Sequence, residues 1–172
     1  ALSKLDIEKK VASLTTVATP HHGTYLADLM LKTPEILTER ISEIVDWFGN
    51  NVYPREKSDS IGSVEQLTLE YVQEVFNQST PTPASIPIFS YSAAVGKGTN
   101  YSLNPIFKIQ NVLIFDHEGS NDAFVSVKSA KWGEHLGTVN ISHLNQINVQ
   151  VGKEAKQKYL DLWLGIVRKL GE

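Results

Sequence analysis

Residues 118–144, with the sequence EGSNDAFVSVKSAKWGEHLGTVNISHL, combine an acidic turn with a histidine turn, and the rest of the chain is organised around them. Asp122 and His143 are 21 residues apart, which leaves room for a short helix and a short strand. A carboxylate held against an imidazole orients the ring and stabilises its protonated form. The ring can then take a proton from a nucleophile, so the pattern predicts the acid and the base of a hydrolytic site.

The nucleophile that usually completes such a site is a serine on a sharp turn with the pattern G-x-S-x-G. This pattern does not occur in the 172 residues. We therefore interpret the chain as the acid-and-base half of a hydrolase, and expect the nucleophile serine on a missing segment or chain. The same observation favours an alternative, in which the chain is a non-catalytic or processed fragment that acts as a binding or docking piece.

Three carboxylates compete for the acid role, namely Asp116, Glu118 and Asp122, which we place in one tight acidic turn. We favour Asp122 because the apolar residues Val125 and Val127 follow it at once and would anchor it to packed structure. The alternating acidic positions also resemble a calcium loop faintly, but the distal glutamate that such a loop needs is absent.

The composition indicates a globular domain, with 41% hydrophobic and 20% charged residues. A net charge of −3 without a basic stripe argues against a nucleic-acid partner. The chain has no cysteine, which excludes a disulfide framework and a thiolate zinc site. No apolar run approaches the roughly 20 residues that a bilayer span needs, and the compartment is left open.

Three short apolar segments are predicted as strands, 11–17 (VASLTTV), 86–94 (IPIFSYSAA) and 136–141 (LGTVNI). The first run is nearly continuous, which suits a strand that is covered on both faces, as in a parallel sheet. A short helix is expected over 127–133 and a terminal helix over 153–170. The expected buried face of the terminal helix consists of Tyr159, Leu162, Trp163, Ile166, Val167 and Leu170.

The long segment 25–78 is predicted to be mainly helical, with two apolar stripes. A capping-box pattern formed by Ser63 and Gln66 is expected to start its last helix. The stripes consist of Leu37, Ile41, Ile44, Val45 and Phe48, and of Leu67, Tyr71, Val75 and Phe76. Both stripes suit core packing, and they also suit a movable cap over an apolar pocket. For 107–115, the pattern does not separate helix from strand.

Two adjacent histidines, His21 and His22, follow the first predicted strand at an edge where ligands often bind in parallel sheets. Neighbouring side chains point in different directions, and no third ligand has a fitting spacing. We therefore expect a structural or surface role for them, or a place in the wall of a substrate pocket, and no metal site.

Three segments resemble the triacylglycerol lipases of the α/β-hydrolase superfamily, in particular a fungal-type branch related to bacterial lipases. Residues 11–28 are similar to the strand and loop that follow the nucleophile elbow, and residues 67–81 to the end of the cap. Residues 118–144 resemble the acid and histidine region almost from end to end. The resemblance implies an α/β fold, namely the C-terminal half of an α/β-hydrolase with a mostly parallel sheet and a helical lid insertion.

By this resemblance, residues 1–172 form a partial lipase domain in which residues 24–80 are the lid. Asp122 is then the triad acid and His143 the general base, and the substrate is a lipid ester met at a lipid–water interface. Hydrolysis and acyl transfer to another alcohol use the same residues. No cofactor is implied.

Two positions depart from the family pattern. Ala123 stands where the family usually has glycine, and Asn145 stands where an acidic residue commonly follows the His-Leu pair. In the bacterial enzymes that acid helps to bind a structural calcium ion. We therefore expect no metal site in this chain.

Overall fold

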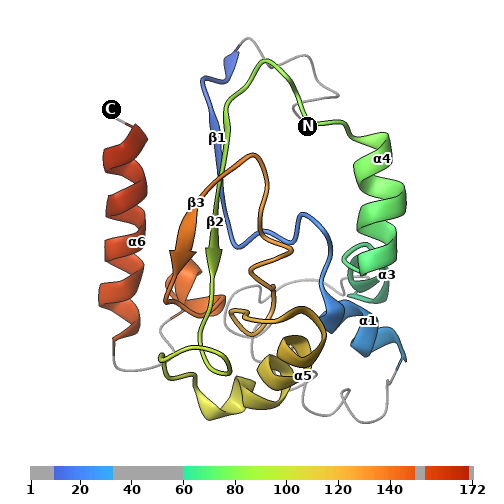
Figure 1. Cartoon of the computed structure of the whole chain (residues 1–172), viewed down its shortest axis with the longest axis vertical. Helices are drawn as coiled ribbons and strands as arrows, with labels where there is room; N and C mark the ends of the chain where they lie inside the picture. Colours follow the sequence, from blue (N-terminus) through green and yellow to red (C-terminus); the bar gives the residue numbers. More distant parts are fainter. Residues whose placement is uncertain (1–9, 33–59, 150–153, 171–172) are drawn as a thin grey trace.

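The computed structural model describes residues 10–32, 60–149 and 154–170. Three strands, β1 (Leu14–Val17), β2 (Ile88–Ala93) and β3 (Glu134–Val139), form a sheet in the order β1-β2-β3 (Figure 1). Both pairs are parallel, as the apolar runs predicted. Among the described helices, none has the length and apolar character that a membrane crossing requires. The helical stripe predicted within 33–59 lies outside the described residues.

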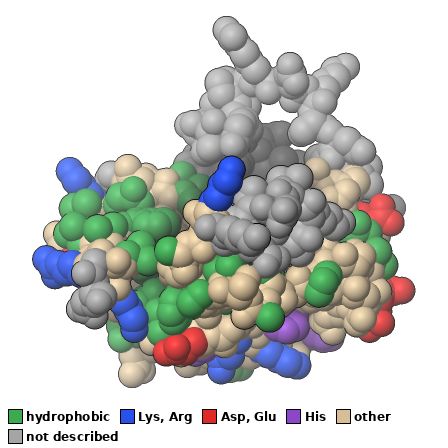
Figure 2. All heavy atoms as spheres, turned by 90° about the horizontal axis from the view of Figure 1, so that it is seen from above, with side chains coloured by type: hydrophobic (Ala, Val, Ile, Leu, Met, Phe, Trp, Pro, Cys, Tyr) green, Lys and Arg blue, Asp and Glu red, His purple; other side chains and the backbone are tan. Residues whose placement is uncertain are grey.

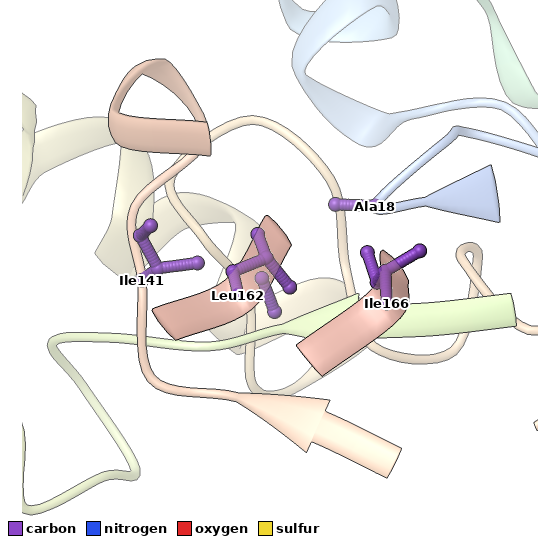
Figure 3. Packing of buried hydrophobic residues seen from close by; sticks show 5 residues of the cluster. Ala18, Ile141, Leu162 and Ile166 are labelled. Atoms are coloured by element: carbon purple, nitrogen blue, oxygen red, sulfur yellow. The ribbon is translucent and has the colours of Figure 1, made fainter. Parts of the chain in front are cut away.

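The main core lies between the sheet and the terminal helix α6 (Ala155–Leu170), which stands on one side of the sheet in Figure 1. Leu162 and Ile166 of α6 pack against Ala18, Ala93 and Ile141, which lie at the carboxyl ends of the three strands (Figure 3). These contacts join the ends of all three strands into one rigid edge.

The predicted buried face of α6 is too wide. Leu162 and Ile166 are buried, but Trp163, Val167 and Leu170 are 38%, 62% and 60% exposed. A sheet of three described strands meets only one narrow stripe of the helix, so the side chains on either side of that stripe stay at the surface. Figure 2 shows hydrophobic side chains beside Lys and Arg at the edge of the molecule where α6 lies.

Residues 107–115 are helical. A 3-10 turn, η3 (Pro105–Phe107), leads into α5 (Lys108–Glu118), so the alternative of a strand at 112–115 is wrong. The side chain of Asn104 accepts a hydrogen bond from the Ile106 backbone and starts the first turn. Because α5 continues to Glu118, the predicted acidic turn is in fact two elements: the last turn of α5 and a loop that begins at Gly119.

The helix predicted over 127–133 is not formed. The chain makes a single turn, in which the Ala130 amide donates to the Ser126 carbonyl at 3.0 Å. The Ser126 hydroxyl accepts a hydrogen bond from the Ser129 amide at 3.0 Å, and such side-chain bonds compete with a continued helix. Gly133, with φ +60°, then lies against the Ile88 carbonyl, where a side chain would not fit.

On the other side of the sheet in Figure 1 lie four helical elements. They are α1 (Tyr25–Lys32), α3 (Ser60–Glu65), the π-helical turn η2 (Tyr71–Phe76) and α4 (Asn77–Ser79). The predicted capping box is wrong, because Ser63 lies inside α3 and Gln66 follows its end. The second predicted stripe is mostly at the surface: Leu67, Val75 and Phe76 are between 42% and 50% exposed.

Candidate active site

The acid loop and the histidine loop meet at the carboxyl edge of the sheet. Just after β2, the Val95 amide donates to the Asn121 carbonyl at 2.9 Å, which places the loop of Asp122 beside the end of this strand. His143 follows the end of β3 by four residues. Its amide donates to the Asp122 carbonyl at 3.1 Å, so the two loops are joined through their backbones.

The side chains of these two residues form a close pair. His143 Nδ1 lies 2.8 Å from Asp122 Oδ2. The Asp122 side chain is fully buried, whereas the His143 side chain is 32% exposed. The Phe124 ring stacks beside the imidazole, with 5.2 Å between the centroids. The structure therefore brings the two predicted site residues together, with the acid inside and part of the ring still open to solvent.

The buried carboxylate of Asp122 accepts four hydrogen bonds. Oδ1 accepts from the backbone amides of Phe124 at 3.0 Å and Val125 at 2.8 Å. Oδ2 accepts from His143 and from Nε2 of Gln146 at 2.9 Å. A buried carboxylate needs such partners because it has lost its hydration. Sequence reasoning did not identify Gln146, which lies three residues after His143 and is buried.

Burial by itself would lower the pKa of the His143 imidazole. The charge of Asp122 and its hydrogen bond to Nδ1 outweigh this effect, so the pKa of His143 is raised above the ordinary value of 6.5. A carboxylate that stabilises the imidazolium in this way equips the ring to accept a proton.

Buried side-chain amides form a hydrogen-bond network that holds the acid loop. The Asn111 side chain donates to Asn121 Oδ1 at 2.7 Å, and the Asn121 side chain donates to the Asn111 carbonyl at 3.0 Å. Gln110 Nε2 donates to the Ala123 carbonyl at 2.7 Å. The sequence analysis missed these three amides. The signal was present, because two of them interrupt the apolar run 107–115 and have no reason to be buried unless they are bonded.

Ala123 occupies a backbone conformation that usually requires glycine. Its φ is +84°, and the residue is fully buried. Its amide donates to Asn121 Oδ1 at 2.9 Å, so the side-chain network holds this geometry in place. The position where glycine is expected by resemblance is therefore a left-handed position here, and alanine fills it with local strain.

The other two carboxylates serve different roles. Asp116 is 58% exposed and pairs with Lys97 at the surface. Glu118 bridges two loops, since Oε2 accepts from the Tyr25 amide at 3.1 Å and Oε1 from the Ser126 hydroxyl at 3.3 Å. Neither carboxylate contacts His143 in this structure.

The histidines after β1 lie in a different environment. His21 Nε2 lies 3.0 Å from the Thr16 hydroxyl, and its ring packs on Trp132 with 4.5 Å between centroids. Burial, assisted by the neighbouring charge of His22, lowers the pKa of His21 to about 4. Nδ1 of His22 lies 3.1 Å from the Ser129 carbonyl. These contacts agree with the structural role expected for both residues.

The described residues do not fit a calcium site. Asn145 supplies a neutral amide and is buried. Within the described ranges, no group of three or more His, Asp or Glu side chains is arranged to hold a metal ion. Calcium prefers several carboxylate and carbonyl oxygens, and Asn145 supplies no carboxylate.

Solved structures of other proteins share the fold of this chain. One is a lipase of Bacillus licheniformis in its mature form, with 22% identity, a TM-score of 0.58, and 83% of this chain and 52% of that chain covered. Another is a metagenomic carboxyl esterase, with 20% identity, a TM-score of 0.61, and 84% of this chain and 40% of that chain covered. The chain has a partial α/β-hydrolase fold, as the resemblance of its sequence implied.

A similar protein of known name is a triacylglycerol lipase. The chain is 33% identical over 144 residues to triacylglycerol lipase 2 of Saccharomyces cerevisiae. The aligned region covers 80% of this chain and 38% of that lipase. No family model matches the chain. The chain is thus a relative of the α/β-hydrolase triacylglycerol lipases and spans about two fifths of the length of the relative it matches.

Proposed function

We propose that this chain is part of a serine-type lipid ester hydrolase, a triacylglycerol lipase or carboxylesterase, and contributes the acid and the base of its catalytic triad. The observation that carries the proposal is the 2.8 Å contact between His143 Nδ1 and a fully buried Asp122 carboxylate, with the ring still partly exposed. The similarity to a triacylglycerol lipase supports the choice of lipid esters as substrates.

In the proposed mechanism, Asp122 binds Nδ1 of His143, so proton transfer falls to Nε2. The ring takes the proton of a serine hydroxyl as that oxygen attacks the ester carbonyl, and the ester oxygen leaves with the same proton as an alcohol. Water then attacks the acyl-enzyme by the reverse sequence and releases the fatty acid. Throughout, the buried carboxylate of Asp122 keeps the ring oriented and stabilises its charged form.

The nucleophile in this proposal comes from a part of the protein outside these 172 residues, together with the amides of the oxyanion hole. The hydroxyls on β2 support this view. Ser90 and Ser92 are fully buried. Ser92 Oγ lies 2.7 Å from the Thr138 hydroxyl and 3.0 Å from His135 Nε2, so it belongs to the packing between β2 and β3.

We further propose that residues 24–80 form the lid of a domain that includes all of residues 1–172. The apolar side chains of Leu31, Leu67, Val75 and Phe76 are between 40% and 50% exposed, as expected for a lid that meets a lipid surface. The base of this segment is attached to the acid loop, because the Thr24 hydroxyl donates to the Phe124 carbonyl. Movements of the lid would therefore start from a fixed point beside the site.

The test is His143→Ala in the full-length protein, assayed with triacylglycerols and short p-nitrophenyl esters. Without the base, kcat is expected to fall by about 10³-fold or more in protein that is still folded. The matched control is His117→Ala, which removes an exposed ring that stacks on Tyr25. Unchanged ester hydrolysis in His143→Ala would refute the proposed function.

A further inference from the structure

Gln146 shares an acceptor atom with the proposed base. Its Nε2 lies 2.9 Å from Asp122 Oδ2, the same oxygen that lies 2.8 Å from His143 Nδ1. The side chain is buried, with 4% of its surface exposed. A buried amide without a partner is costly, so this contact is a strong constraint on both side chains.

The backbone of Gln146 is held as firmly as its side chain. The residue lies in the 3-10 turn η4 (Leu144–Ile147), which begins at the residue after His143. Its carbonyl accepts a hydrogen bond from the indole of Trp163, on α6, at 2.9 Å. Gln146 therefore connects the acid loop, the histidine turn and the terminal helix through two hydrogen bonds.

From this geometry we propose that Gln146 is a positioning residue for the acid–base pair, on the basis of the proposed function. Its amide fixes Oδ2 of Asp122 where Nδ1 of His143 needs it, while two backbone amides fix Oδ1. Because the amide places a partial positive charge beside Oδ2, it also moderates the negative charge that the imidazole experiences. Gln146 thus sets both the orientation of His143 and the pH range in which the ring acts as a base.

The effect of Gln146 on the pKa of His143 can be measured because Asp122 is the main charge that acts on the ring. Among the described residues, Asp122 is the charged group that acts on His143. The other members of η4 are neutral. On α6, Lys158 lies near Ser142 and Asn145, and its ammonium pairs with Glu154 at 3.6 Å. Removal of the Gln146 donor therefore changes the electrostatic potential at the His143 ring mainly because it leaves more negative charge on Asp122 Oδ2.

The experiment is an NMR titration of the His143 imidazole in the full-length protein, which follows the ring whether or not the protein turns over substrate. Gln146→Met keeps the length of the side chain and removes the donor, so the pKa of His143 is expected to rise by about 0.5–1. Gln146→Leu also removes the donor, and the pKa of His143 should rise by a similar amount. In the active protein, the acidic limb of the pH dependence of kcat/KM should move upward with the pKa.

The matched control is Gln73→Met. The amide of Gln73 donates to the His22 carbonyl at 2.9 Å, away from the Asp122 carboxylate. This variant should leave the pKa of His143 unchanged. The proposal is overturned if folded Gln146→Met leaves that pKa unchanged, or if Gln73→Met raises it equally. If Gln146→Met does not fold, Gln146→Leu decides by the same criterion. Failure of the proposed function would instead show as retained hydrolysis in His143→Ala.

Discussion

Two loops at the same edge of the sheet each carry a histidine, and they give it opposite properties. After β1, His21 packs on Trp132 and has its pKa lowered to about 4. After β3, His143 binds Asp122 and has its pKa raised. Burial acts against the charged form of both rings. A position at a strand end therefore does not raise the pKa of a histidine, whereas a hydrogen-bonded carboxylate does.

The largest expected effect comes from removing the negative charge of Asp122. Asp122→Asn keeps the shape of the side chain but offers His143 Nδ1 a neutral partner, so the pKa of the ring should fall and resemble that of His21 more closely. In the full-length protein, kcat for ester hydrolysis should fall by about 10³–10⁴-fold. Steady-state kinetics and an NMR titration of the ring would measure both changes. An unchanged pKa would contradict the role assigned to the carboxylate.

Each loop also contains an alanine in a left-handed conformation, Ala18 with φ +44° and Ala123 with φ +84°. Both are buried, so a β-branched side chain has neither the conformation nor the space. Ala123→Val and Ala18→Val should each lower the free energy of unfolding by about 2–3 kcal/mol in urea denaturation. Of the two, Ala123→Val should in addition change the pKa of His143, because it displaces the Asp122 loop. Equal pKa values in both variants would contradict this difference.

The two rings should also give the stability opposite dependences on pH. A group with a lowered pKa stabilises the fold above its unfolded value, and this contribution is lost as the pH falls through the folded value. For His21 the loss should occur between about 6.5 and about 4. His21→Asn is therefore expected to remove roughly 1–3 kcal/mol of pH dependence in that window, measured by urea denaturation at several pH values.

For His143 the sign is reversed. Its pKa is raised, so its contribution is fully present below the unfolded value of 6.5 and is lost as the pH rises through the folded value. Asp122→Asn should therefore flatten the stability profile on this alkaline side, measured by urea denaturation at several pH values. A profile that stays equally steep there would mean that the pair does not act as described.

The smallest effect is expected at the competing carboxylate. Asp116 pairs with Lys97 where both side chains are well exposed, and pairs of this kind contribute little. Asp116→Asn should change the free energy of unfolding by less than about 1 kcal/mol and leave ester hydrolysis unchanged. A large loss of activity in this variant would move the acid role away from Asp122.

Some of the architecture was predictable because it follows from local patterns. The runs 11–17, 86–94 and 136–141 were predicted as strands, and each overlaps a strand of the parallel sheet. The helix predicted at 127–133 was wrong because the Ser126 hydroxyl accepts a hydrogen bond from the Ser129 amide there, which composition does not reveal. The exposed faces of α6 and η2 were also mispredicted, since periodicity locates a helix stripe but not the width of the surface that covers it.

By itself, the sequence determined the residue types and their order along the chain: an acid, a short connection, a strand and a histidine. The apolar residues after Asp122 favoured it over Asp116 and Glu118, but the contact between its carboxylate and the ring is visible in the fold alone. The decision lies in long-range contacts, namely buried amides on α5, the left-handed backbone at Ala123, and Gln146 held by Trp163. These contacts join residues far apart in sequence, and their energies depend on burial, which the order of residues alone does not fix.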